Sequence, residues 1–90
     1  MASNFHLFQI PNKDRLHIYM QGDFDGTSAH ELINALKKQI QDYCTVFIDT
    51  NDLNQIHNFG VDVFQKKLIT GIKSSRNLVF IGKHKHRFAG

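Results

Sequence analysis

The chain has 90 residues, 41% of them hydrophobic and 21% charged, which is the composition of one globular domain rather than of a disordered chain. No apolar run approaches the ~20 residues that a membrane-spanning helix needs, and the N-terminus lacks the pattern of a signal peptide, so we expect a cytoplasmic protein. The single cysteine, Cys44, excludes an internal disulfide. Because it precedes an apolar run, we predict a buried, unreactive thiol.

The formal net charge of +3 hides an uneven distribution. Residues 1–62 contain all eight acidic residues and four basic ones, whereas residues 63–90 contain seven basic residues and no acidic one. Such an asymmetry can attract acidic partners or phosphate groups. A solvated helix face followed by a basic tail is the simpler explanation.

The first predicted elements are two β-strands and a helix. Phe5–Ile10 is a β-type run that ends at the turn-forming residues 11–14, and apolar and polar side chains alternate over residues 16–21. Their short link predicts an antiparallel hairpin. Ser28 and Glu31 then have the spacing of a capping box, so we place the start of an amphipathic helix at Ser28.

A second strand and helix follow. Val46–Ile48 is typical of a buried strand, which we expect to end at Asp49 and to lead into a polar loop. Apolar residues then recur at helical spacing from Val61 to Leu68, and Asn58 is a suitable N-cap for this helix.

The remaining segment adds one strand. Leu78–Ile81 is a continuous apolar run of the kind found in internal parallel strands. Residues 83–90 are either a frayed basic tail or the first turn of another helix. The order β-β-α-β-α-β therefore predicts one α/β domain over residues 1–90, with a four-stranded mixed sheet and the helices mainly on one face.

Three short segments resemble the STAS domain of sulfate transporters and bacterial anti-sigma factor antagonists. The family pattern has G-x-x-D before the first helix, a strand that ends in Asp, and I-D-S-S-G at the start of the second helix. The corresponding segments here are Gly22-Asp23-Phe24-Asp25, Phe47-Ile48-Asp49 and Ile56-His57-Asn58-Phe59-Gly60. The resemblance covers about residues 14–82.

The resemblance implies a non-catalytic regulatory module of bacterial signalling and transcription control, which needs no cofactor. Its partner would be a protein, such as an anti-sigma factor or a kinase-like regulator. In that family an unmodified serine of the D-S-S-G segment permits docking, and phosphorylation of this serine abolishes it. The partner-binding residues that the resemblance implies are Asp23, Asp25, Asp49, His57, Asn58, Phe59 and Gly60.

The chain departs from the family pattern at the phosphorylation site. His57 replaces the Asp, Asn58 occupies the phospho-acceptor position, and Phe59 follows it. A Ser/Thr kinase can modify neither Asn58 nor Phe59. We therefore expect docking through the loop and the N-terminus of the second helix without control by serine phosphorylation. Phe59 would be either an exposed interface anchor or a core residue.

Parts of the sequence are also compatible with other functions. The basic segment could bind phosphate or nucleic acid, although no nucleic-acid-binding motif is present, and a STAS-like domain could instead bind a small ligand. Asp49, Asp52 and His57 could form an acid/base cluster, but the chain carries no known catalytic motif, so we do not expect an enzyme. We also expect no metal site, because lysines and Arg87 flank His84 and His86.

Overall fold

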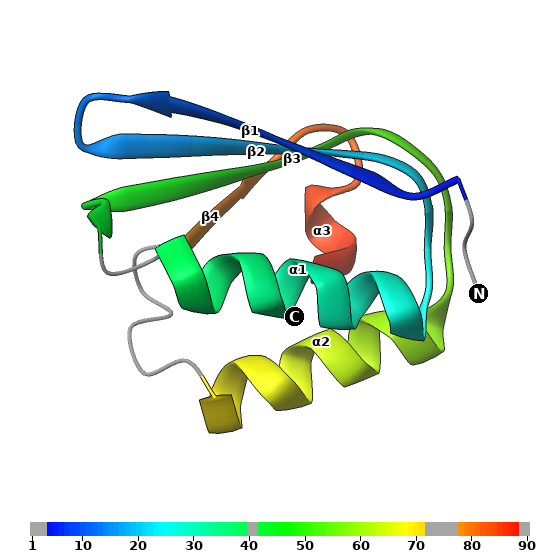
Figure 1. Cartoon of the computed structure of the whole chain (residues 1–90). Coiled ribbons are helices and arrows are strands. Elements are labelled where there is room, and N and C mark those ends of the chain that lie inside the picture. The colour runs from blue at the N-terminus through cyan, green and yellow to red at the C-terminus, as the bar shows by residue number, and fades with distance from the viewer. Residues whose placement is uncertain (1–3, 40–41, 72–77, 89–90) are drawn as a thin grey trace.

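The computed structural model describes residues 4–39, 42–71 and 78–88, which form a four-stranded sheet and three helices (Figure 1). The elements in chain order are β1 (His6–Asn12), β2 (Arg15–Phe24), α1 (Gly26–Gln39), β3 (Thr45–Ile56), α2 (Asn58–Gly71), β4 (Leu78–Ile81) and α3 (Lys85–Phe88). The predicted order β-β-α-β-α-β is confirmed, with the short α3 added at its end. The residues Ser74-Ser75-Arg76, for which the sequence predicts a loop after the second helix, lie outside the described residues.

The sheet is mixed and has the strand order β1-β2-β3-β4. β1 and β2 form the predicted antiparallel hairpin, in continuous register from His6 opposite Gln21 to Asn12 opposite Arg15. Its turn contains Lys13, which takes a left-handed conformation with φ of 59°. β2 pairs with β3 and β3 with β4 in parallel, so the chain crosses over through α1 and then through α2.

The hydrophobic core lies between the sheet and the two long helices, which cover one face of the sheet (Figure 1). Alternate residues of β2 and β3 point into it, among them the fully buried Ile18 and Ile48. The predicted apolar stripe of α1 meets them and includes Leu32, while α2 contributes Phe64. Full burial stabilises such a side chain by about 1.5–3 kcal/mol relative to exposure, so this layer fixes where both helices lie.

The C-terminal segment is helical at residues 85–88, so the helix alternative is correct for these residues. Phe88 of α3 is only 4% exposed. Its ring stacks on Phe80 at 5.3 Å and meets Phe24 edge-on at 4.9 Å. The basic residues of α3 remain at the surface. Phe88 therefore anchors this segment and closes one end of the core.

β3 is longer than predicted. The strand does not end at Asp49 but continues to Ile56, where we had expected a polar loop. Its second half pairs with the end of β2, with Leu53 opposite Gly22 and Ile56 opposite Phe24, after shifts in register. Leu53 is buried in the core. Pairing with β2 and the burial of Leu53 hold the polar segment after Asp49 in strand conformation.

Two further predictions are wrong in detail. α1 begins at Gly26 rather than at Ser28, because Asp25 is the N-cap: its carboxylate accepts a hydrogen bond of 3.0 Å from the amide of Ser28. Ser28 therefore lies inside the first turn and does not form the predicted capping box with Glu31. Cys44 is exposed rather than buried.

Candidate functional site

The N-terminal ends of α1 and α2 lie in close contact. A β-carbon at Gly60 would lie only 2.6 Å from the carbonyl carbon of Asp25, so a residue without a side chain is needed there. Just before α2, the amide of His57 donates a hydrogen bond of 2.9 Å to the carbonyl oxygen of Phe24. The two strand-to-helix junctions are thereby held together as one surface, which we call the helix-junction surface (residues 23–26 and 57–60).

Phe59 projects from this surface and is 71% exposed. Its ring lies against the start of α1, where a β-carbon at Gly26 would be 3.0 Å from the ring atom Cε2. Phe59 is therefore not a core residue, which excludes one of its two predicted roles. An aromatic ring in this position offers a large apolar contact area on a rigid base.

Asn58 is the first residue of α2, yet its side chain does not cap the helix. The first helical hydrogen bond runs from the amide of Val61 to the carbonyl of His57 at 3.2 Å, so His57 occupies the N-cap position. The side-chain oxygen of Asn58 instead accepts a hydrogen bond of 2.7 Å from Arg87. Our prediction that Asn58 is the N-cap is therefore wrong.

Arg87 is a residue of this site that the sequence reasoning missed. The same nitrogen, Nη2, donates to the side chain of Asn58 and, at 3.0 Å, to the carbonyl oxygen of Ile56. α3 is thus tied to the end of β3 and the start of α2. The contact joins residues 29 and 31 positions apart, so no local pattern signals it. The one signal in the sequence is Phe88, because an aromatic residue in a basic tail indicates that the tail packs against the core.

Asp23 and Asp25 support the junction. The carboxylate of Asp23 accepts a hydrogen bond of 3.3 Å from the amide of Gln55, which links β2 to β3. The carboxylate of Asp25 is bonded to both the amide and the hydroxyl of Ser28. The hydrogen bond from the Ser28 amide lowers the pKa of Asp25, because it stabilises the ionised carboxylate.

Asp49 lies away from the helix-junction surface. Its neighbours in β3, Ile48 and Thr50, are fully buried beneath the helices, so Asp49 points to the open face of the sheet. Its carboxylate accepts a hydrogen bond of 2.8 Å from the amide of Asn51. Asp49 stands seven positions before Ile56, which is roughly 20 Å along a strand. We predicted that Asp49 lies near His57 because we expected β3 to end at Asp49.

The alternative acid/base cluster is also wrong in its geometry. Asp49 and Asp52 belong to β3, whereas His57 lies at the start of α2. Asp52 lines an open hollow on the sheet face with Phe8, Ile10, Tyr19 and Gln21, and His57 does not line it. Among the residues that the structure describes, no group of three or more His, Cys, Asp or Glu could hold a metal ion.

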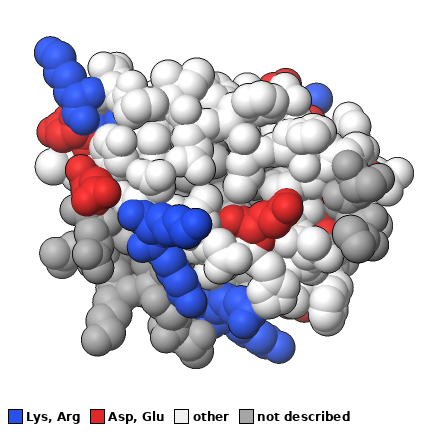
Figure 2. Space-filling view, viewed as in Figure 1, with Lys and Arg blue, Asp and Glu red and all other residues white. Residues whose placement is uncertain are grey.

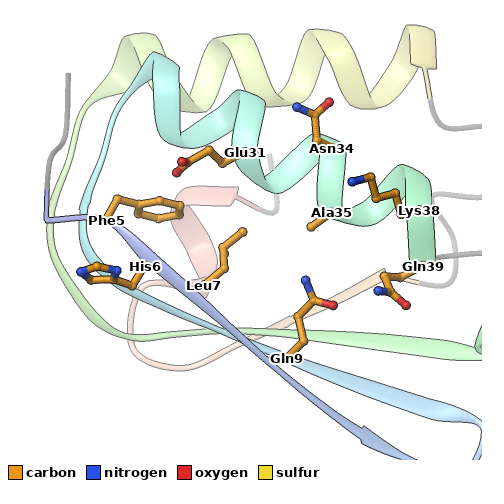
Figure 3. Close-up of a pocket in the computed structure, with 9 residues that line it drawn as sticks. All are labelled: Phe5, His6, Leu7, Gln9, Glu31, Asn34, Ala35, Lys38 and Gln39. Carbon is orange, nitrogen blue, oxygen red and sulfur yellow. The ribbon is translucent and has the colours of Figure 1, made fainter.

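A second hollow lies between β1 and α1 and has a volume of about 450 Å³ (Figure 3). Sequence reasoning did not predict this β1–α1 groove. Its apolar wall comes from Phe5, Leu7 and Ala35, and its polar rim comes from both elements: His6, Gln9, Glu31, Asn34, Lys38 and Gln39.

Comparison with known proteins defines the class of fold. A STAS domain of an antisigma-factor antagonist from Rhodobacter sphaeroides aligns with a TM-score of 0.67 and 15% identity over 92% of this chain and 91% of that one. The anti-sigma factor antagonist SpoIIAA in its unphosphorylated form aligns with a TM-score of 0.59 and 13% identity over 84% of this chain and 70% of that one. The chain therefore has the STAS fold of these anti-sigma factor antagonists, as predicted.

Two other structures share the fold. An uncharacterized protein from Shewanella loihica, described as having a SpoIIAA-like fold, aligns with a TM-score of 0.62 and 16% identity over 92% of this chain and 72% of that one. A protein named Mglu aligns with a TM-score of 0.66 and 16% identity over 84% of this chain, which spans only 19% of the Mglu chain. No family model and no curated protein matches the sequence.

In the described part of the chain, no helix is both long enough and apolar enough to cross a bilayer.

Proposed function

We propose that the chain is a non-catalytic regulatory module that binds a protein partner through the helix-junction surface. The observation that carries this proposal is the position of Phe59, which is 71% exposed and rests on the paired starts of α1 and α2. The STAS fold supports it, because solved anti-sigma factor antagonists share this fold. The proposed partner is an anti-sigma factor, of the kinase-like kind that the sequence resemblance implies.

Phe59 suits the role of an interface anchor for physical reasons. Large aromatic side chains at the centre of an interface commonly supply much of the binding free energy. The base beneath the ring is fixed by the contact between Gly60 and Asp25, so little conformational entropy is lost when a partner docks. The hydrogen bonds from Arg87 to Ile56 and Asn58 brace the neighbouring backbone.

In this proposal, binding is not controlled by phosphorylation at the family position. Asn58 has no hydroxyl group, and its side-chain oxygen is already bonded to Arg87. Thr50 carries a hydroxyl group in β3, but it is fully buried and donates a hydrogen bond of 2.8 Å to the carbonyl of Ile81. A kinase could reach Thr50 only after local unfolding. The site therefore stays in a state equivalent to the unphosphorylated one.

The proposal can be tested by calorimetric titration of this chain with each kinase-like anti-sigma factor that is encoded in the source genome. We expect Phe59→Ala to weaken binding by about tenfold or more, since it removes an anchor worth at least about 1.4 kcal/mol. The matched control is Val79→Ala, which trims an exposed apolar residue on β4 and should leave binding unchanged. Both variants should melt within a few degrees of the wild type. No binding to any of these proteins, or equal binding by Phe59→Ala, would refute the proposal.

A further inference from the structure

We propose that two copies of this chain associate through their β1 edges, so that two four-stranded sheets join into one continuous eight-stranded sheet. The occupant of the β1–α1 groove would then be the β1 strand of the second copy. This inference is independent of the proposed function, because it uses the opposite side of α1 from the contact with α2.

The free edge of β1 is unusually well suited to strand pairing. β1 is the outermost strand, and no described strand pairs with its outer side, which presents a row of backbone N–H and C=O groups. Natural edge strands are usually protected by charged residues, by proline, by bulges or by being short. β1 has seven residues, none of them Lys, Arg, Asp or Glu, and its pairing with β2 has no register shift. Pro11 blocks only its last part.

Apolar side chains flank this edge on both faces of the sheet. On the open face, Phe8 is 48% exposed and Ile10 is 55% exposed, and they account for two of the four large hydrophobic residues exposed in the described chain. On the helix face, Phe5 and Leu7 line the β1–α1 groove (Figure 3). A strand added beside β1 would thus gain apolar contacts on both sides as well as backbone hydrogen bonds.

The charges around the groove favour a second copy over a foreign peptide. Glu31 and Lys38 both line the groove, and their separation of seven helical residues corresponds to about 10.5 Å along α1. A two-fold axis that passes midway between Glu31 and Lys38 would set the two α1 helices antiparallel, with Glu31 of each copy facing Lys38 of the other. Figure 2 shows acidic and basic side chains side by side across the surface over α1. A second copy supplies both complementary charges, whereas β1 itself adds no charge that could oppose the pairing.

The first test measures the association constant of the 90-residue chain by sedimentation velocity over a concentration series at low salt. We expect a reversible monomer–dimer equilibrium, which Phe8→Lys should weaken by about tenfold or more, because like charges would meet across the new strand pair. Val79→Lys is the matched control, since it places the same charge on an exposed residue at the opposite edge of the same sheet face. It should leave the dimer intact. Circular dichroism would verify that both variants fold.

A charge-exchange experiment tests the geometry itself. Glu31→Lys and Lys38→Glu should each weaken self-association by about tenfold. In a dimer of either variant, positions 31 and 38 of the two copies would carry the same charge, and this repulsion would occur twice because of the two-fold symmetry. When the two variants are mixed, opposite charges face each other again, and dimers should reappear. A wild type that stays monomeric, equal effects of Phe8→Lys and Val79→Lys, or no recovery on mixing would each overturn the proposal. A monomer that instead binds a short extended peptide in the groove would assign the edge to a foreign strand.

Discussion

Gly60, in the first turn of α2, packs directly against the backbone of Asp25, the N-cap of α1. A β-carbon at position 60 would lie 2.6 Å from the carbonyl carbon and 2.7 Å from the carbonyl oxygen of Asp25. Side chains can rotate away from such a conflict, but backbone atoms at a helix start cannot. This single contact therefore sets how closely the two helices approach, and with it the shape of the helix-junction surface.

We predict that Gly60→Ala destabilises the protein by about 1–3 kcal/mol, because the added methyl group forces the two helix starts apart. The free energy of unfolding in urea measures this loss. Gly26→Ala is the matched control: its β-carbon would meet only the ring of Phe59, at 3.0 Å, and that exposed ring can move. A Gly60→Ala loss no larger than that of Gly26→Ala would contradict the account.

The order and faces of the elements could be predicted because each depends on local pattern. Alternation in residues 16–21 and the apolar run at Val46–Ile48 identify strands that the structure confirms. The spacing of apolar residues in α1 and α2 identifies the buried helix faces. These patterns depend on which side chains avoid water, and that preference is decided within a few neighbouring residues.

The missed features depend on contacts between distant residues. The polar segment after Asp49 is a strand because the end of β2 pairs with it, and no local pattern signals that pairing. Two residues suit the N-cap of α1, and Asp25 rather than Ser28 takes this position once β2 extends to Phe24. Arg87 reaches Asn58 only because Phe88 anchors α3 in the core.

The next prediction concerns how the N-cap of α1 makes the stability of the fold depend on pH. Because the hydrogen bond from the Ser28 amide lowers the pKa of Asp25 in the folded chain, the ionised carboxylate stabilises the fold at pH values above its unfolded pKa of about 4. This contribution is lost as the pH falls through the lower, folded pKa. Asp25→Asn keeps a capping oxygen but cannot ionise, so its stability deficit should shrink below pH 4.

Urea unfolding of the wild type and of Asp25→Asn between pH 7 and pH 2.5 would measure this deficit. A deficit that stays constant across this range would show that ionisation of Asp25 does not matter. Asp25→Ala provides the reference for complete loss of the cap, and we expect it to cost about 1 kcal/mol at pH 7.

The last prediction concerns the link between α3 and the helix-junction surface. Arg87→Ala removes the hydrogen bonds to the carbonyl of Ile56 and to the side chain of Asn58. Both bonds are exposed to solvent, so we expect a global loss of only about 0.5–1.5 kcal/mol. The larger effect should be local: the end of β3 and the first turn of α2 should open more often, because α3 no longer braces them.

Amide hydrogen exchange at residues 56–61 would detect this local opening. Lys85→Ala is the matched control, since it removes the same charge from an exposed position of the same helix. We expect faster exchange at these amides in Arg87→Ala and unchanged exchange in Lys85→Ala. Equal acceleration in both variants would mean that the positive charge of α3, rather than the two hydrogen bonds of Arg87, stabilises the junction.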